Sequence, residues 1–206
     1  AAGGSGGHIY PAVALAEALE ENGVKAGDIM ILASRKRLDR SLLAPYPYRR
    51  RHLSVNPMPL KRFTRSWAVF AVKLFADMIA SLYHVFLFRP DVAVGFGGYS
   101  SGTVALACRA AGVPVIIHEQ NMVPGRANRM LRGLACRIAV SFEDTSQYFP
   151  DVCGKVVYTG NPLRKDSLSG ERASALKRLG LEDGKFTVLV MGGSQRSTFL
   201  NTAVSE

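Results

Sequence analysis

Three glycine-rich segments are the part of this chain whose residue types and spacing most clearly predict chemistry. They are residues 3–8 (Gly-Gly-Ser-Gly-Gly-His), 95–102 (Gly-Phe-Gly-Gly-Tyr-Ser-Ser-Gly) and 192–195 (Gly-Gly-Ser-Gln). Each stands where a strand should run into a helix. Glycine permits positive φ and lets a ligand approach the main chain, and the N–H groups of a helix N-terminus attract phosphate. Three such segments predict a protein that binds phosphorylated ligands.

The first segment ends on His8, beside the place where a phosphorylated ligand would lie. The dinucleotide fingerprint Gly-x-Gly-x-x-Gly is not met because Ile9 stands at its last glycine position, and no P-loop Gly-Lys-Ser/Thr follows. The pattern therefore favours neither a dehydrogenase nor a nucleoside triphosphatase. Histidine titrates near neutral pH and can act as a general base. We interpret His8 as a candidate base, with a helix-capping histidine as the alternative.

Two polar segments follow predicted strands further along the chain. Residues 118–121 (His-Glu-Gln-Asn) place four polar side chains at the end of an apolar run. Such groups are costly to bury unless they are hydrogen-bonded, either to a hydroxyl-rich sugar or within a turn. Residues 160–164 (Gly-Asn-Pro-Leu-Arg) place an arginine just after a turn. Arg164 is therefore either a bidentate phosphate ligand or a surface charge.

The elements that must position these residues alternate between strands and helices. The apolar runs that read as buried parallel strands are residues 29–33, 91–95, 114–118, 137–141 and 155–159. Helical patterns are residues 10–21, 101–111, 124–134 and, less clearly, 141–149. This alternation predicts an α/β fold, a Rossmann-like doubly wound parallel sheet. Ligands of such sheets bind at the carboxyl ends of the strands, so the polar segments should gather at one edge.

Composition bounds the class of protein. The chain has 206 residues, 48% of them hydrophobic, and a formal net charge of +10. It is long enough for a full core, too apolar for a disordered chain, and basic enough to favour anionic partners. Its three widely spaced cysteines form no Cys-x-x-Cys pair, which favours a reduced cytosolic protein without a disulfide framework or a zinc site.

Residues 60–88 form one long apolar stretch that is the size of a membrane span. Its polar side chains fall within a sector of roughly 100° on a helical projection, which suits a helix at an interface or on a core better than a spanning one. The arginines at 49–51 and the basic residues at 61, 62 and 65 lie nearby. Apolar residues beside clustered basic ones are typical of a helix on an anionic lipid surface. The alternative is a core helix with a solvated polar stripe.

The two ends of the chain predict an incomplete protein. Only two residues precede Gly3, so the strand that should lead into the first glycine loop is expected to be missing. Residues 186–191 read as a buried strand that opens a second domain. We therefore expect an N-terminal domain over residues 1–164 and a linker with the start of a second domain over residues 165–206.

The segments together resemble the peptidoglycan N-acetylglucosaminyltransferases of the MurG family. Five motifs carry the resemblance in order: residues 3–12, 95–102, 118–128, 160–164 and 192–195. The resemblance implies the N-terminal domain of a two-domain GT-B glycosyltransferase that moves N-acetylglucosamine from UDP-N-acetylglucosamine to the 4-hydroxyl of lipid I, giving lipid II. It also implies inversion at the sugar, no cofactor and no obligatory metal. The enzyme is expected to lie peripherally on the cytoplasmic face of the bacterial plasma membrane, with residues 60–88 facing the lipid.

The resemblance further implies roles for single residues. His8 is the favoured base, with Glu119 as its rival. The acceptor diphosphate is expected to be lined by Gly97, Gly98 and Tyr99. Donor contacts are expected from Ser5, Gly6, Gly7, Asn121, Arg164 and Ser194, with the first three able to contact the acceptor diphosphate instead.

The sequence departs from the family pattern in the first and third loops. Ser5 stands where threonine is commoner, and Arg196 and Ser197 stand where glycine and alanine are usual. The donor-reading residues of the second domain are not in this chain, so we expect it to be inactive alone. The alternatives are a related GT-B transferase with another lipid-linked acceptor, a non-catalytic basic module on membrane or nucleic acid, and a fragment without function. Nucleic acid is disfavoured because no recognition motif appears.

Overall fold

The computed structural model describes residues 1–54, 65–167, 169–191 and 202–204. The chain divides into two compact units, Ala1–Arg164 and Lys165–Glu206. The first unit contains α1 (Gly6–Glu21), β1 (Met30–Ser34), α2 (Arg37–Leu43), β2 (Arg49–Leu53), α3 (Arg65–Phe88), β3 (Ala93–Gly95), α4 (Tyr99–Ala110), β4 (Val115–Glu119), α5 (Arg126–Leu131), β5 (Arg137–Val140) and β6 (Val156–Tyr158). The second contains α6 (Arg172–Leu179).

All the strand pairs of the first unit are parallel. Strands β3, β4, β5 and β6 are neighbours in that order, and β1 pairs with β2. The first residues of the chain bridge the two groups: the Ala2 N–H donates to the Leu32 carbonyl at 3.0 Å, and the Phe96 N–H donates to the Ala1 carbonyl at 2.9 Å. The order of strands thus reverses at this bridge, the position where doubly wound sheets bind ligands. The predicted fold class is confirmed.

The bridge also bears on the expected missing strand. Ala1 and Ala2 take the backbone pairing of a strand between β1 and β3. A cavity of about 430 Å³ is lined by Ala1 and by side chains of α1, β1 and β3.

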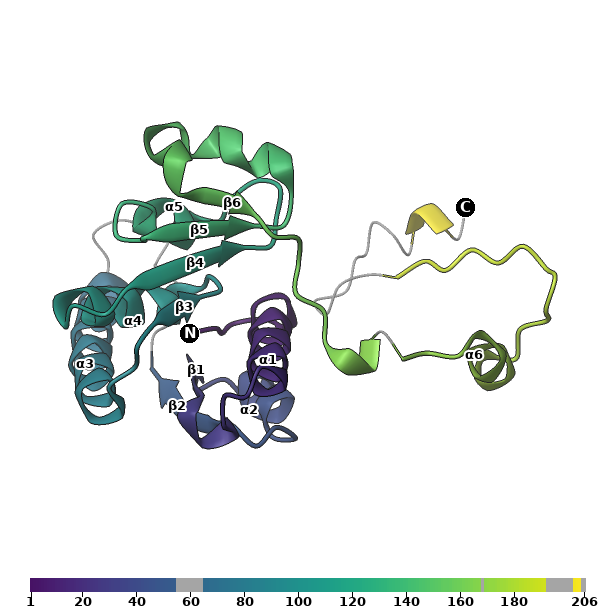
Figure 1. Ribbon diagram of the computed structural model, residues 1–206, viewed down its shortest axis with the longest axis horizontal. Helices are drawn as coiled ribbons and strands as arrows, with labels where there is room; N and C mark the ends of the chain where they lie inside the picture. Colours follow the sequence, from purple (N-terminus) through teal and green to yellow (C-terminus); the bar gives the residue numbers. More distant parts are fainter. Residues whose placement is uncertain (55–64, 168, 192–201, 205–206) are drawn as a thin grey trace. The chain divides into compact units, whose positions relative to one another are not determined.

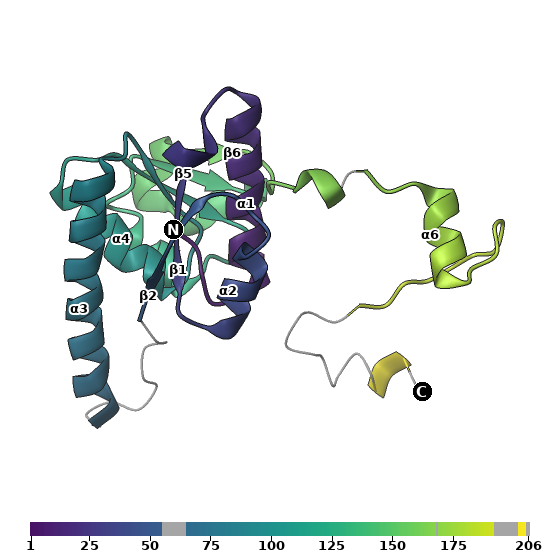
Figure 2. The ribbon, with the colours of Figure 1, turned by 90° about the horizontal axis from the view of Figure 1, so that it is seen from below.

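Alternating side chains of β1 feed two cores on opposite faces of the sheet. Leu32 packs in one cluster with residues of α4, β4 and β5, while Ile31 and Ala33 pack in the other with α1. Helices α1 and α2 lie on one side and α3 and α4 on the other (Figures 1 and 2). This is the two-residue period of a strand that is buried on both faces.

The polar stripe of helix α3 faces the protein, which is the reverse of a core helix with a solvated polar stripe. Asp77 and Ser81 from its polar stripe are buried, and the Asp77 carboxylate accepts a 2.8 Å hydrogen bond from the Ser54 N–H at the end of β2. Its outward side chains are apolar and exposed: Val69, Val72, Leu74, Phe75, Ile79, Tyr83, Phe86 and Leu87. Among the described residues, α3 is the one helix long and apolar enough to cross a membrane. A solvated polar stripe is therefore the wrong interpretation, because the stripe faces the protein.

Several expected elements differ at their ends or were not predicted. Helix α1 begins at Gly6, with Ser5 as its N-cap, so Gly6, Gly7 and His8 are helical and Pro11 lies inside the helix. Residues 143–148 form a 3-10 turn and not an α-helix. Helix α2 and strand β2 had no sequence prediction. Three exposed arginines occupy the start of β2, and this edge strand carries no apolar run that would reveal it.

In the second unit, α6 covers Arg172–Leu179. The buried strand predicted at residues 186–191 is wrong. The segment is unpaired and exposed, with Phe186 94% accessible. An apolar run becomes a buried strand only beside partner strands and a core, and the part of this unit that the structure describes supplies neither.

Candidate active site at the carboxyl edge of the sheet

Two of the glycine loops meet where the strand order reverses. One follows residues 1–2 and the other follows β3. A Cβ added to Gly98 would lie 2.6 Å from the Gly3 carbonyl oxygen, and one added to Gly97 would lie 3.0 Å from Cε1 of His8. Both glycines have positive φ, 90° at Gly97 and 79° at Gly98. The loops touch this closely because neither position carries a side chain.

Each of these loops opens a helix. Helix α1 begins at Gly6 and α4 begins at Tyr99, with Ser5 and Gly98 as their N-caps and no side-chain capping bond at either. The N–H groups of a first helical turn have no partner within the helix. Two helix N-termini side by side form a region that favours a negatively charged group. Tyr99 is half-buried, and its ring meets that of Phe70 from α3 edge-on at 6.5 Å.

A buried carboxylate accepts hydrogen bonds from the main chain of the first glycine loop. Asp39 is fully buried, and one of its oxygens accepts hydrogen bonds from the Gly4 N–H at 2.9 Å, the Ser34 N–H at 3.1 Å and the Ser34 hydroxyl. A Cβ on Gly3 would lie 2.9 Å from that same oxygen. Asp39 therefore fixes the path of the main chain that leads into α1. It was not predicted from the sequence, where its only trace is one acidic residue among four basic residues at positions 35–40.

His8 belongs to a hydrogen-bonded chain that joins three of the sequence motifs. Nδ1 of His8 lies 3.2 Å from Oε1 of Gln120. Nε2 of Gln120 lies 3.1 Å from Nδ1 of His118 and 3.0 Å from the His118 carbonyl oxygen. Nε2 of His118 lies 3.1 Å from the Gly160 carbonyl oxygen. Burial lowers the pKa of His118, so this histidine is neutral at neutral pH.

Glu119 occupies a different environment from His8. It is 1% exposed and accepts four hydrogen bonds, from the Asn121 N–H and side-chain amide, the Gly125 N–H and the Asn128 side-chain amide. All four donor–acceptor distances lie between 2.9 and 3.0 Å. The carboxylate thus organises the turn after β4. Asn121 is exposed at this turn, and Asn128 was not predicted from the sequence.

Arg164 contacts two tyrosines, one of which lies near the start of α1. Its Nη1 donates to the Tyr46 hydroxyl at 3.1 Å, and its guanidinium carbon lies 4.0 Å from the centroid of the Tyr10 ring. A Cβ on Gly6 would in turn contact the Tyr10 ring at 3.2 Å. Arg164 is thus held beside the glycine loop by cation–π stacking and a hydrogen bond.

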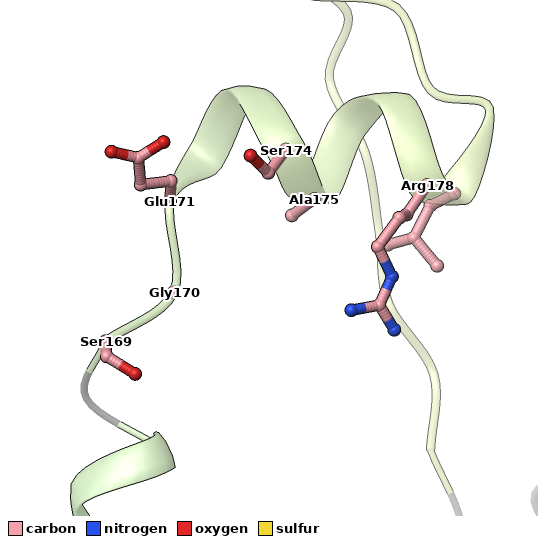
Figure 3. Close-up of a pocket in the computed structure, with 7 residues that line it drawn as sticks. Ser169, Gly170, Glu171, Ser174, Ala175 and Arg178 are labelled. Carbon is pink, nitrogen blue, oxygen red and sulfur yellow. The ribbon is translucent and has the colours of Figure 1, made fainter.

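The remaining predicted site residue, Ser194, lies outside the described residues, as does the third glycine segment. A pocket of about 480 Å³ runs along α6 in the second unit, lined by Ser169, Gly170, Glu171, Ser174, Ala175, Arg178 and Leu179 (Figure 3). It contains none of the predicted site residues. No cluster of three or more His, Cys, Asp or Glu side chains able to hold a metal occurs in the described part of the chain.

The sequence matches the Glycosyltransferase family 28 N-terminal domain over residues 1–140. It is also similar to enzymes named UDP-N-acetylglucosamine–N-acetylmuramyl-(pentapeptide) pyrophosphoryl-undecaprenol N-acetylglucosamine transferase. The protein of that name from Halothermothrix orenii is 36% identical over 98% of this chain and 54% of its own length. The one from Clostridioides difficile is 36% identical over 98% of this chain and 49% of its own length. The chain spans about half the length of these relatives.

The solved structures show a similar likeness. The crystal structure of Acinetobacter baumannii MurG is 29% identical with a TM-score of 0.65, covering 78% of this chain and 44% of that one. The UDP-N-acetylglucosamine 2-epimerase of Methanocaldococcus jannaschii shares the fold at 16% identity and a TM-score of 0.59, over 88% of this chain and 52% of the epimerase. The fold, the paired glycine loops and the family match over residues 1–140 together show that this chain belongs to glycosyltransferase family 28.

Proposed function

We propose that this chain is the acceptor-binding half of an inverting transferase that moves N-acetylglucosamine from UDP-N-acetylglucosamine to the 4-hydroxyl of lipid I, giving lipid II for peptidoglycan. The observation that carries the proposal is the position of His8, which stands between two adjoining glycine loops at the N-termini of α1 and α4. The names of relatives that match nearly the whole chain support this substrate pair.

In the proposed reaction His8 acts as the general base. Its Nε2 takes the proton of the acceptor 4-hydroxyl as that oxygen attacks the anomeric carbon of the donor sugar. The bond from the anomeric carbon to the diphosphate oxygen breaks, UDP leaves, and the configuration inverts. We favour His8 over Glu119 because the Glu119 carboxylate already accepts four hydrogen bonds, three from the turn after β4 and one from Asn128 in α5.

We assign the two helix N-termini to diphosphate binding. The first turns at Gly6 and Gly7 and at Gly98 and Tyr99 present N–H groups to a common region. Their juxtaposition suits the diphosphate of the lipid-linked acceptor, which must lie beside the base.

The donor is assigned to the remaining predicted residues. Arg164 stands beside Gly6, where its guanidinium can stabilise the charge that develops on departing UDP. Asn121 on the exposed turn after β4, Ser5 and Ser194 complete the donor contacts proposed for this half. We assign the rest of the donor site to the portion of the longer relatives that lies outside the matched half.

We further propose that α3 contacts an anionic membrane at the cytoplasmic face of the plasma membrane. Its exposed row includes Phe75 at 69% and Phe86 at 66% accessibility. Strand β2 packs against α3, and the guanidinium carbon of Arg49 lies 5.8 Å from the ring centroid of Phe88. An apolar helix face beside basic residues is the combination that binds anionic lipid surfaces. Such contact would bring the loops to a lipid-linked substrate.

A transfer assay tests the enzymatic proposal. The chain extended by the portions of its longer relatives that it does not span, with UDP-N-acetylglucosamine and a lipid I analogue, should add one N-acetylhexosamine to the acceptor, read by mass. The 206-residue chain should give no product. A folded, donor-binding extended protein that transfers to another lipid-linked acceptor, and not to lipid I, would establish the related-transferase alternative.

A further inference from the structure

The hydrogen-bonded chain at His8 ends on two groups that can only accept hydrogen bonds. One is the Gly160 carbonyl oxygen, 3.1 Å from Nε2 of His118, and the other is the His118 carbonyl oxygen, 3.0 Å from Nε2 of Gln120. Carbonyl oxygens carry no proton. The facing nitrogens must therefore be donors, which determines every proton between them.

The protonation state of the His118 ring can be assigned first. Its Nε2 donates to the Gly160 carbonyl oxygen. The ring is 3% exposed, and burial keeps it neutral, so it carries a single ring proton and its Nδ1 is an acceptor. The Gln120 amide nitrogen at 3.1 Å is the donor that this acceptor faces.

The orientation of the Gln120 side-chain amide follows from this assignment. Its amide nitrogen donates both to Nδ1 of His118 and to the His118 carbonyl oxygen. A flipped amide would place an oxygen against two acceptors, so the orientation of the side chain is unambiguous. Its Oε1 therefore faces His8 and accepts from Nδ1 of that ring at 3.2 Å.

We propose that Gln120, oriented by His118, is a positioning residue that holds His8 as the Nδ1–H tautomer and so leaves the Nε2 lone pair for the acceptor hydroxyl. The inference rests on the proposed base role of His8. The other tautomer would put a proton on Nε2, and that nitrogen could not accept one from a hydroxyl. The Cε1 edge of the His8 ring faces Gly97: a Cβ added there would stand 3.0 Å from Cε1, 3.3 Å from Nδ1 and 3.6 Å from Nε2.

This series of hydrogen bonds joins sequence motifs that are far apart in the polypeptide. The His8–Gln120 bond joins residues 112 apart, and the His118–Gly160 bond joins residues 42 apart. A partner that orients a metal-bound histidine typically contributes about 10–100-fold. We expect an effect of that size when Gln120 loses its oxygen.

The first test reads the tautomer directly in the 206-residue chain. Long-range nitrogen–proton NMR at neutral pH should show His8 with a protonated Nδ1 and an unprotonated Nε2. In Gln120→Met, which keeps the length of the side chain without its polar atoms, the Nε2–H form should appear. The control Gln147→Met makes the same change at an exposed position of the 3-10 turn at Glu143–Tyr148 and should leave His8 unchanged.

The second test uses turnover of the extended protein. Gln120→Met should lower kcat about 10–100-fold with KM nearly unchanged. A His8 ring protonated on Nε2 in the unsubstituted chain, or a tautomer unaffected by Gln120→Met, would overturn the inference. Absence of transfer in the extended protein would count against the proposed function alone, because the NMR readout needs no activity.

Discussion

The contact between the two glycine loops yields the sharpest prediction about stability. Gly98 has φ 79° and ψ 167°, a region that only glycine occupies readily and that costs other residues about 1–3 kcal/mol. A Cβ there would also lie 2.6 Å from the Gly3 carbonyl oxygen. Because that atom is main chain, the two loops must separate, at an overpacking cost of about 1–3 kcal/mol. Gly98→Ala should therefore lower the free energy of unfolding by about 2–6 kcal/mol.

Substitutions at two other glycines separate the conformational cost from the overpacking cost. Gly112 has a similar positive φ of 77° but nothing within 4 Å of an added Cβ. Gly112→Ala should therefore show the conformational cost alone, about 1–2 kcal/mol. Gly102 lies inside α4, also with open space around it. Gly102→Ala should stabilise the chain by about 0.5–1 kcal/mol, since alanine is the better helix former.

Urea unfolding of the four proteins measures these differences. The single tryptophan of the chain, Trp67, lies on α3 and reports on the first unit. Its fluorescence and far-UV circular dichroism should give coincident transitions if that unit unfolds in two states. If Gly98→Ala is no more destabilising than Gly112→Ala, the close approach of the two loops is not a determinant of this fold.

Three further outcomes follow from buried, exposed and titrating groups. Asp39→Ala should lower the free energy of unfolding by about 3 kcal/mol, because three donors lose their acceptor at about 1 kcal/mol each; the exposed Asp28→Ala serves as control in the same urea titrations, and equal effects would refute the role of Asp39. Phe75→Ser with Phe86→Ser should weaken binding to anionic vesicles in sedimentation assays while leaving the melting temperature unchanged, and unaltered binding would remove α3 from the membrane contact. The lowered pKa of His118 means that the unfolded chain binds more protons, so stability should be complete above about pH 6.5 and decline as the pH falls below it; His118→Gln should flatten this slope in melting curves.

The sequence alone was enough to predict the class of fold and the edge that carries the chemistry. Buried parallel strands appear as short apolar runs between helical patterns, and their carboxyl ends must share one edge. The placement of His8, Gly97, Gly98 and residues 118–121 at that edge follows from these local patterns.

The tertiary structure decided which partners surround each of these groups. Asp39 reaches Gly4 across 35 residues, and His8 reaches Gln120 across 112. The four hydrogen bonds that the Glu119 carboxylate accepts come from Asn121, Gly125 and Asn128, and only the structure reveals them.

The same division holds for α3 and for the second unit. The period of α3 establishes two faces, but only the burial of Asp77 and its hydrogen bond from the Ser54 N–H show that the polar face turns inward. Residues 186–191 are apolar enough for a buried strand yet are exposed, because burial depends on partner strands as well as on composition. Local periodicity is a property of consecutive residues, whereas hydrogen-bond partners and buried faces are set by the packing of elements that are remote in the chain.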